Sequence, residues 1–579
     1  MWRLFRVAFC RYGICLLLAV ALSGCDWDAS SGTSSGSSGS GGSGDSEEAA
    51  ANEPDTTPPI VQATSPEPGS RGVERAGVIT AQFNEDIFAS TVTENSFTLI
   101  RLSDSITTPG DVSFDADSNT AGFSSHLPLA MLETYSANLS TDITDLEGNA
   151  LAEQYSWSFT AADGEWQTAG LIESNDSGGF GSARAAQVAL DADGRGLAVW
   201  EQFQGSRYKI WSNRYDGSAW GTPGLIESNS GGAASGGQLA MNASGQAFAV
   251  WQQDNSSVNN IWANRFAGGG WGAAGVIQTN PASDARDPQI AIAPDGKAMA
   301  VWAQFQATCH KVWARPFDGS VWGAAQAMRP EDNDSGGNAC ESSPPQVSID
   351  SSGRALIVWA ELEGVLSTIW TNRFDGNSWG SPRQIQANTA NDARTPSIAM
   401  TEAGEALVVW AESDGFRYNI WANHFENENW GTAERIETDN TGTAQNPQIA
   451  VGADGQAIAV WQQYDGSVYN IVANRYDSGS WGEAAAIETD TANGARNPQV
   501  AVDGNGRALA VWEQFEDGQY RVWANRYAEG SWGEAGRIEE EAGSPASAPQ
   551  VAFDGAGKAL AVWHQFDGAR DNIWANRFE

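Results

Sequence analysis

The residues Asn497–Phe515 read N-P-Q-V-A-V-D-G-N-G-R-A-L-A-V-W-E-Q-F, and related segments occur eight times before Glu579. One tryptophan marks each copy, at Trp200, Trp251, Trp302, Trp359, Trp410, Trp461, Trp512 and Trp563. Successive tryptophans are 51 residues apart, except for one step of 57. A repeat of this length with several short strands is typical of a β-propeller blade. The sequence therefore predicts a scaffold with one or two binding faces rather than a helical or Rossmann-type enzyme.

Each copy contains four short segments that can form strands. In the quoted copy, residues 499–503 alternate in polarity and residues 508–514 form a second apolar segment. A glycine six residues before the tryptophan is present in all eight copies, which suits a hairpin turn that needs positive φ. Further strands are expected at 521–527 and 531–539. The repeat thus predicts four antiparallel strands per copy.

The two ends of the repeat region supply parts of one unit. The chain enters with a lone fourth strand at 166–173 and stops at Glu579, after the third strand of the last copy. Pairing these ends would leave no open sheet edge. We therefore predict an all-β protein in which residues 165–579 form an eight-bladed propeller, closed by its N-terminal outer strand.

The first residues are typical of an exported protein. Basic residues at 3, 6 and 11 precede the apolar stretch 14–22, which is a secretory signal and too short for a stable membrane span. It ends in L-S-G-C at Leu22–Cys25, which resembles the lipobox of bacterial lipoproteins. The resemblance implies cleavage after residue 24 and acylation of Cys25, which would anchor the chain to a lipid bilayer of the cell envelope. An ordinary signal peptide is the alternative.

Between this signal and the repeats lie a tether and a second folded unit. Residues 25–57 are rich in Ser and Gly and then acidic, which predicts a flexible tether. Residues 58–161 show short alternating runs at sandwich-like spacing. Three passages, at Asp55–Val61, Phe83–Ile87 and Asp145–Leu151, resemble the bacterial Ig-like domain of surface-layer and adhesin proteins. That resemblance implies an Ig-like β-sandwich that acts as a spacer or interaction module.

Composition and motifs exclude several function classes. The chain has 72 acidic and 32 basic residues, a formal net charge of −40, which argues against nucleic acid as a partner. The four histidines are scattered, so neither a metal site nor a cofactor is predicted. The repeats resemble sialidase-type and fungal fucose-lectin propellers only loosely and lack the Asp-box of sialidases.

Most repeated residues are interpreted as structural. The tryptophans are expected to fill the core rather than to stack on sugars, because aromatic side chains dominate such burial. The Asn-Arg pair of the third strand, as in Asn525-Arg526, is expected to make structural hydrogen bonds. Candidate functional residues are therefore sought where copies differ.

Two such differences concern carboxyl groups and cysteines. The Gln two residues after the tryptophan becomes Glu361 and Glu412 in adjacent copies, which makes them weak candidates for a glycosidase acid pair; a tolerated Gln-to-Glu exchange is the alternative. Cys309 and Cys340 both fall in atypical loops on the same face. In an oxidising compartment they are expected to form a disulfide.

A third difference is an arginine found only in odd-numbered copies. It stands three residues before the first-strand Gln or Ser, as Arg184, Arg286, Arg394 and Arg496. Because first strands line the channel of a propeller, we expect these arginines around its mouth, where guanidinium groups could bind an acidic glycan. The alternative is that each pairs with a local carboxylate, such as Asp287 beside Arg286.

These observations favour a monomeric, lipid-anchored envelope protein whose propeller binds a glycan or another envelope polymer. Two alternatives stay open. One is a sialidase-like or other glycoside-active enzyme, and the other is a scaffold for envelope assembly, an analogy at the level of fold alone.

Overall fold

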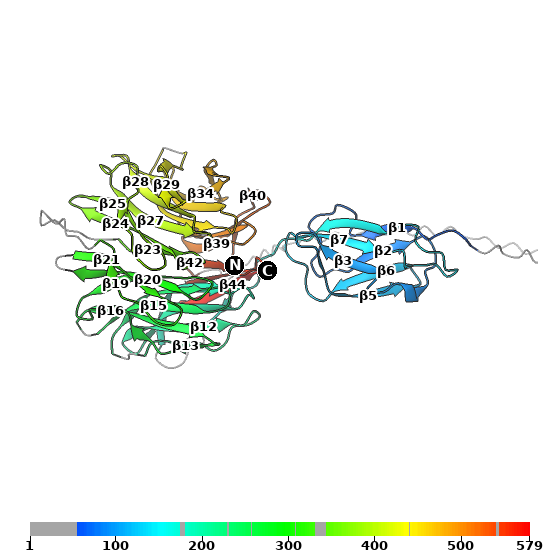
Figure 1. The fold of residues 1–579 in the computed structure, drawn as a ribbon, viewed down its shortest axis with the longest axis horizontal. Coiled ribbons are helices and arrows are strands. Elements are labelled where there is room, and N and C mark those ends of the chain that lie inside the picture. Colours follow the sequence, from blue (N-terminus) through cyan, green and yellow to red (C-terminus); the bar gives the residue numbers. More distant parts are fainter. Residues whose placement is uncertain are drawn as a thin grey trace, which may run out of the picture. The chain divides into compact units, whose positions relative to one another are not determined.

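The computed structural model describes residues 55–173, 180–228, 231–255, 257–306, 309–329, 343–438, 441–539 and 544–579, and its described elements are strands and one 3₁₀ turn (Figure 1). Internal contacts divide the chain into Met1–Thr56 and Thr57–Glu579. Among the described residues, no helix has the length and apolar character needed to cross a bilayer. The predicted signal segment, Cys25 and the Ser/Gly stretch lie outside the described residues.

The N-terminal described domain is an Ig-like sandwich of two antiparallel sheets. One sheet has the order β1 (Val61–Ser65), β2 (Ile79–Phe83), β6 (Thr120–Ser125) and β5 (Gly110–Asp115). The other has the order β4 (Ile106–Thr107), β3 (Phe97–Arg101), β7 (Thr134–Leu139) and β8 (Tyr155–Thr160), and the 3₁₀ turn η1 spans Ala89–Thr91. Phe83, Phe97 and Phe159 contribute to one core between the sheets. Alternate burial along β7 shows why its pattern of apolar and polar residues selects a strand.

The repeats form eight antiparallel sheets, numbered here first to eighth along the chain. Their first strands are β10 (Phe180–Leu190), β14 (Ala234–Met241), β19 (Ala285–Ile292), β23 (Gln346–Ile349), β27 (Ala393–Met400), β32 (Ala444–Val451), β37 (Ala495–Val502) and β42 (Ala546–Phe553). The second strands are β11 (Gly196–Gln204), β15 (Ala247–Asp254), β20 (Ala298–Gln306), β24 (Ala355–Glu363), β28 (Ala406–Ser413), β33 (Ala457–Tyr464), β38 (Ala508–Glu516) and β43 (Ala559–Phe566).

The third strands are β12 (Arg207–Tyr215), β16 (Asn259–Ala267), β21 (Cys309–Phe317), β25 (Leu366–Phe374), β29 (Tyr418–Glu426), β34 (Tyr469–Asp477), β39 (Gln519–Ala528) and β44 (Asp571–Phe578). The outer positions hold β13 (Gly224–Leu225), β17 (Gly270–Trp271) with β18 (Gly275–Val276), β22 (Gln326–Ala327), β26 (Arg383–Gln384), β30 (Asn429–Trp430) with β31 (Glu434–Arg435), β35 (Ser480–Trp481) with β36 (Ala485–Ala486), β40 (Ser531–Trp532) with β41 (Gly536–Arg537), and β9 (Gly170–Leu171). The predicted fourth strand at 531–539 is thus two short pieces rather than one continuous strand.

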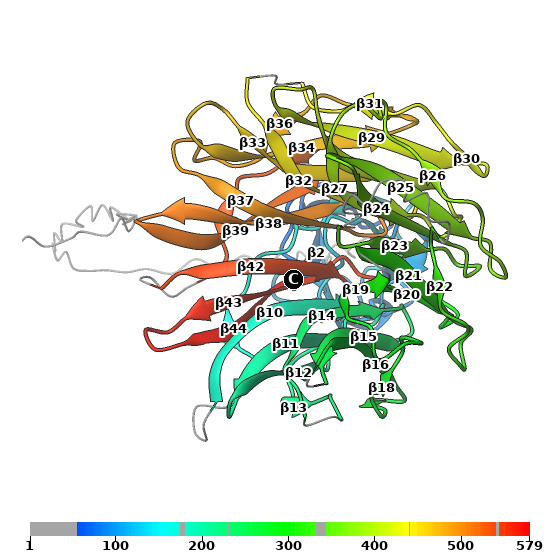
Figure 2. The same cartoon turned by 90° about the vertical axis from the view of Figure 1, so that its left-hand side faces the viewer.

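The sheets follow one another and the last meets the first. Strand β9 precedes the first sheet in sequence but pairs with β44 of the eighth, Leu171 opposite Trp574. First strands of consecutive sheets contact each other throughout, and β42 contacts β10 (Figure 2). Sheets of four antiparallel strands in this arrangement fit a propeller. The predicted pairing of the two ends of the repeat region is confirmed.

The core lies between neighbouring sheets. The marker tryptophans of all eight copies are at most 1% exposed. Trp512 of the seventh sheet packs with Val460 and Ile471 of the sixth, so each indole fills a junction between two sheets. Its Nε1–H donates to Oε1 of Gln514, two residues further on, at 3.0 Å. The prediction that these tryptophans are core residues is confirmed.

An asparagine of the third strand joins seven of the eight sheets to the preceding one; in the third sheet Arg315 stands at this position and donates to Ile277 at 2.6 Å. Asn525 donates from Nδ2 to the carbonyl oxygens of Ile487, in the preceding sheet, and Gly533, in its own, at 2.7 and 3.1 Å. Arg475 lies with its guanidinium 5.7 Å from the ring centre of Tyr527 in the next sheet. The Asn-Arg pair is therefore structural, as predicted, and its contacts hold adjacent sheets in register.

Candidate binding site at the mouth of the central channel

A cavity of about 430 Å³ opens where the first strands of the fourth to eighth sheets begin. We call it the mouth cavity. Its lining consists of Ser343, Pro344, Gln346, Thr395, Pro396, Asn446, Pro447, Gln448, Asn497, Pro498, Gln499, Ala548, Pro549 and Gln550. None of these side chains is ionisable, although the chain has 72 acidic residues. The cavity therefore offers amides, hydroxyls and proline rings, and no group that could act as an acid or a base.

A β-bulge at the start of the first strands builds this lining. In β37 the register shifts between Arg496 and Gln499, so that Asn497 and Pro498 occupy the bulge. The first bulge residue has positive φ in seven sheets, at Ala185, Gly236, Asp287, Thr395, Asn446, Asn497 and Ala548. Proline, which has no N–H to give to a ladder, is tolerated at a bulge. The bulge turns both residues towards the cavity.

The sequence contained a signal for this site that the sequence analysis missed. The tripeptide x-Pro-Gln, or Thr395-Pro396-Ser397 in the fifth copy, recurs at the strand start in six of the eight copies. A proline within an apparent central strand indicates a bulge or an edge. Residues beside an edge or bulge that recurs around a ring are candidates for a binding site.

Thr395 is the strained member of this set. Its φ of 51° lies in the left-handed region, which a β-branched residue rarely adopts. We predict that Thr395→Asn, the residue found at positions 446 and 497, raises the free energy of unfolding by about 1 kcal/mol. Chemical unfolding of both proteins measures this, with Asn446→Thr as the reverse control, which should lose a similar amount. Equal stability of all three proteins would contradict the assignment of strain.

Hydrogen bonds link neighbouring sheets at four of the junctions around the mouth. At these junctions the residue after the marker tryptophan accepts the N–H of the bulge residue in the next sheet. Glu201 Oε1 accepts from Gly236, and Glu513 Oε1 accepts from Ala548, at 2.8 and 2.9 Å. Gln252 and Gln462 bind the N–H groups of the next sheets, those of Asp287 and Asn497, at 3.0 and 3.2 Å.

The four predicted arginines lie at this end of the sheets, but they do not line the cavity. Arg184 and Arg496 pair with Glu201 and Glu513 on the adjacent strand, at 2.9 and 2.7 Å. Their guanidinium groups lie 3.9 and 3.6 Å from the ring centres of Tyr208 and Tyr520 on the third strand.

The other two arginines behave in a related way. Arg394 lies 3.6 Å from the ring centre of Tyr418, and Arg286 is 3.5 Å from Asp287. The expectation that these side chains surround the mouth needs correction, because the side chains stacked on tyrosine cross their own sheet towards the third strand instead of entering the channel.

Glu361 and Glu412 lie at two different junctions between sheets. Glu361 is 6% exposed, accepts from Trp359 and pairs with Arg329 Nη1 at 2.9 Å. Glu412 is 1% exposed and accepts from Trp410 at 3.0 Å. Burial raises the pKa of Glu412. The structure therefore does not bring these two carboxyl groups together as an acid pair.

The junctions explain why Glu appears at these two positions. In the other six copies the second residue after the tryptophan is Gln, and in five of them an acid follows the outer strand of the preceding sheet; Gln278 is the exception. Glu539, for example, accepts from Gln565 at 2.7 Å. Where this Gln becomes Glu361 or Glu412, the facing position is Arg329 or Gln386. No junction therefore carries two carboxyl groups at these two facing positions. This supports the interpretation that Glu361 and Glu412 are tolerated structural exchanges of Gln for Glu and not a catalytic acid pair.

Cys309 is buried and disulfide-bonded. Its predicted partner, Cys340, lies outside the described residues, so the pairing of these two cysteines stays a prediction.

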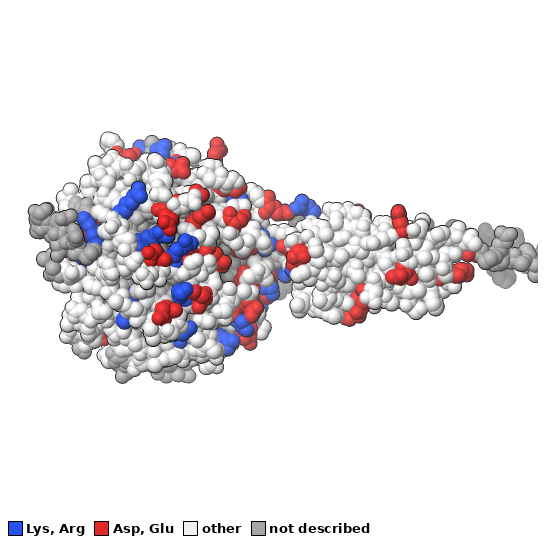
Figure 3. Space-filling view, viewed as in Figure 1, with Lys and Arg blue, Asp and Glu red and all other residues white. Residues whose placement is uncertain are grey.

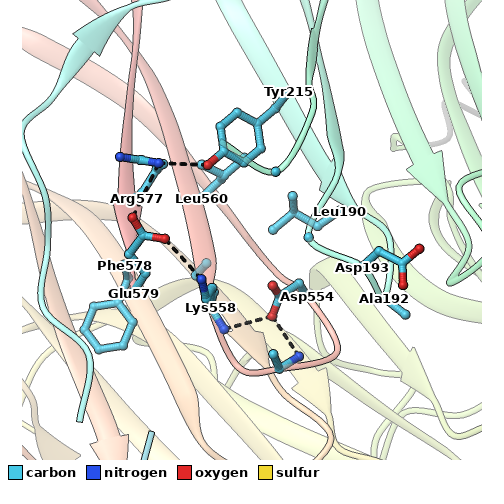
Figure 4. A pocket seen from close by; sticks show the side chains of 14 residues that line it. Leu190, Ala192, Asp193, Tyr215, Asp554, Lys558, Leu560, Arg577, Phe578 and Glu579 are labelled. Atoms are coloured by element: carbon cyan, nitrogen blue, oxygen red, sulfur yellow. Dashed lines mark hydrogen bonds and ion pairs between the residues drawn. The ribbon is translucent and has the colours of Figure 1, made fainter. Parts of the chain in front are cut away.

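A second cavity, of about 300 Å³, lies at the opposite end of the sheets, between the first and the eighth (Figure 4). Its charged side chains are already paired. Arg577 donates to the hydroxyl of Tyr215 at 3.0 Å, and Lys558 lies 3.3 Å from Glu579. The bond between Arg577 and Tyr215 joins the last sheet to the first. On the face shown in Figure 3, basic side chains likewise lie beside acidic ones rather than gathering as a patch of one sign.

Comparison with known proteins identifies one of the two domains. Among solved structures, the chain is similar to a protein of unknown function from Dyadobacter fermentans, with 11% identity and a TM-score of 0.36, over 72% of this chain and 99% of that chain. It is similar to an α-L-arabinanase of Penicillium chrysogenum (13%, TM-score 0.31, 50% and 92%) and to a PL25 ulvan lyase (9%, TM-score 0.39, 69% and 94%). No curated protein matches the chain. Residues 55–161 match the family described as bacterial Ig-like domain, so the chain carries that domain, as predicted.

Proposed function

We propose that this protein is a cell-envelope binding protein, that its eight sheets form one closed eight-bladed propeller, and that the mouth cavity binds a glycan. The composition of the lining carries this proposal. Gln448, Gln499 and Asn497 can donate to and accept from sugar hydroxyls, and the proline rings between them offer apolar faces. Concave sites of this size with a few convergent polar groups are typical of ligand sites.

The same lining favours binding over catalysis. Glycoside hydrolysis commonly needs two carboxyl groups on either side of the scissile bond. The mouth cavity has none, and the two acids considered for that role are buried at separate junctions. A binding role therefore accounts for the site without further groups.

Anchoring completes the proposal. The lipobox-like sequence at Leu22–Cys25 and the Ser/Gly tether support acylation of Cys25 and attachment to the bilayer of the cell envelope. The Ig-like domain would then act as a spacer between the tether and the propeller.

The test is binding of the full-length protein to a panel of immobilised polysaccharides. We expect at least one polysaccharide to retain the protein. The double variant Gln448→Leu with Gln499→Leu should bind that polysaccharide at least tenfold more weakly, because leucine has a similar volume but cannot form the hydrogen bonds. The matched control is Gln187→Leu with Gln238→Leu, at the equivalent positions of the first and second sheets, which do not line the cavity. Retention of no polysaccharide, or equal loss in both double variants, would contradict the proposal.

A further inference from the structure

Three consecutive sheets at the mouth cannot form the links to the next sheet, and in the eighth sheet the position is His564, which bonds Ser547 of its own sheet at 2.9 Å. Glu201, Gln252, Gln462 and Glu513 each accept the bulge N–H of the next sheet. In the third, fourth and fifth sheets the same position is Ala303, Ala360 and Ala411. An alanine side chain has no acceptor, so these three sheets cannot form the link.

The bulge residues of the sheets that follow these three alanines differ in whether they have an N–H group that lacks this acceptor. Ala303 precedes the sheet that begins with Pro344, which has no N–H to be satisfied. Ala360 and Ala411 precede the sheets of Thr395 and Asn446, whose φ values of 51° and 54° match those of the linked bulges. Their N–H groups therefore take the same conformation without an acceptor from the preceding sheet, and both residues line the mouth cavity.

The fifth sheet also differs from the others in a first-strand side chain and in the partner of its arginine. Ser397 stands where the other sheets have glutamine. Arg394 has Ala411 opposite it on the next strand, where Arg184 and Arg496 have glutamates. In the described part of the chain, no carboxylate lies within ion-pair distance of Arg394, although Arg184 and Arg496 are both paired.

The nearest acid on the same segment is already engaged. Asp392 accepts the N–H of Ser367 at 2.7 Å and the hydroxyl of Tyr418, on which Arg394 stacks. Thr395 holds its N–H in a backbone conformation that costs a β-branched residue free energy, and such strain gathers at ligand sites. This sector of the mouth thus combines two backbone donors and a hydroxyl, and the residue before Thr395 is Arg394, whose guanidinium stacks on Tyr418.

We propose that the N–H groups of Thr395 and Asn446, with Arg394 at their edge, form the subsite for an anionic oxygen group of the ligand. The fitting chemistry is a carboxylate or a sulfate carried by a glycan, since both accept backbone N–H bonds and bind guanidinium. This inference rests on the proposed function and names the charged group that the mouth cavity recognises.

The first experiment restores the missing links. Ala360→Gln with Ala411→Gln places at both positions the residue found at 252 and 462, which should occupy the two N–H groups and leave the fold intact. We expect affinity for polygalacturonate oligomers or dextran sulfate to fall at least tenfold. Ala303→Gln is the matched control, because it adds the same bulk opposite Pro344, where there is no N–H; its affinity should change less than twofold. Thermal melting checks that all variants fold.

A second variant tests the positive charge of the subsite without changing the links between sheets. Arg394→Ser introduces the residue that stands at 235 and 547, and it should weaken binding of the anionic probes more at low salt than at high salt. Arg184→Ser is its control, because Glu201 already neutralises Arg184.

The outcomes separate this inference from the proposed function. Wild-type binding of polygalacturonate in preference to dextran sulfate assigns the group as carboxylate, and the reverse preference assigns it as sulfate. Neutral dextran bound as tightly as both charged probes would overturn the anionic subsite but leave glycan binding standing. The same holds if the restored links or Arg394→Ser leave affinity unchanged. Failure of the wild-type protein to bind any polysaccharide would overturn both proposals.

Discussion

Replacing Arg521 by asparagine is expected to lower the free energy of unfolding by about 3–5 kcal/mol at pH 8.5. Arg521 Nη1 lies 3.2 Å from Glu539 Oε1, and the two side chains are only 4% and 0% exposed. Removing the guanidinium leaves a buried carboxylate without its charge partner. Asparagine fits this place in the third strand, because it is the residue at 260, 419, 470 and 572.

The loss should depend on pH in a defined direction. Burial raises the pKa of Glu539 and the charge of Arg521 lowers it, so the variant has a still higher folded-state pKa. A carboxyl group whose pKa is raised in the folded protein contributes stability that is full below its unfolded-state pKa and is lost as the pH rises to its folded-state pKa. The variant should therefore recover part of the loss between pH 8.5 and pH 6, where Glu539 takes up a proton.

A double variant separates charge from packing. Arg521→Asn with Glu539→Gln produces the Asn and Gln pair that the second sheet has at 260 and 278, and it should regain most of the stability at pH 8.5. Urea unfolding of the wild-type protein, of the single variants Arg521→Asn and Glu539→Gln, and of the double variant gives the coupling energy between the two positions. Equal stability of the wild-type protein and Arg521→Asn at pH 8.5 would contradict the assignment of a buried ion pair.

Much of the fold could be predicted because each element repeats. The glycine turn, the alternating strands and the buried tryptophan occur in every copy, so no single ambiguous segment decided the result. The pairing of β9 with β44 followed from the incomplete first and last copies. Sequence spacing alone was sufficient for these features, since they depend on backbone periodicity.

The site could not be predicted from spacing, because a bulge changes the face on which side chains lie. The prediction for the four arginines assumed that a residue at the start of the first strand points to the channel. The register shift between Arg496 and Gln499 instead places the guanidinium over Tyr520 and gives the channel to Asn497 and Pro498. A bulge of one residue is enough to reverse such an assignment.

The side-chain pairs at the junctions between sheets could not be predicted, for a different reason. Glu361 faces Arg329, and Glu539 faces Gln565, pairs that are 32 and 26 residues apart and belong to neighbouring sheets. Comparing copies at one position at a time shows a Glu where Gln is usual, but it does not show the compensating change at the facing position. The pairing becomes visible only when the sheets are placed beside each other.

The junction between the sixth and seventh sheets allows a second strong prediction. Replacing Glu488 by glutamine should raise the free energy of unfolding by about 3 kcal/mol at pH 8.5. Glu488 is 8% exposed, and the residue at the position of Arg521 in its own sheet is Asn470, which brings no positive charge. Burial raises the pKa of Glu488 from 4.5 to about 8.

The direction in which the free energy of unfolding changes with pH follows from this raised pKa. The folded protein holds a proton on Glu488 between pH 4.5 and about 8, where the unfolded chain does not, so its contribution to stability is full below pH 4.5 and is lost as the pH rises to about 8. Glutamine has the shape of the protonated acid and does not titrate. Glu488→Gln should therefore lose less stability than the wild-type protein between pH 6 and pH 8.5.

Unfolding curves at intervals between pH 6 and pH 8.5 measure the difference. Glu483→Gln is the control, because this exposed glutamate lies on the same sheet and its replacement should change stability by less than about 0.5 kcal/mol at every pH. The equivalent positions 278 and 386 already hold glutamine, so the substitution introduces no side chain that a junction cannot accommodate. Parallel curves for Glu488→Gln and the wild-type protein would show that Glu488 is ionised and solvated throughout, and would remove the buried acid from the account of these junctions.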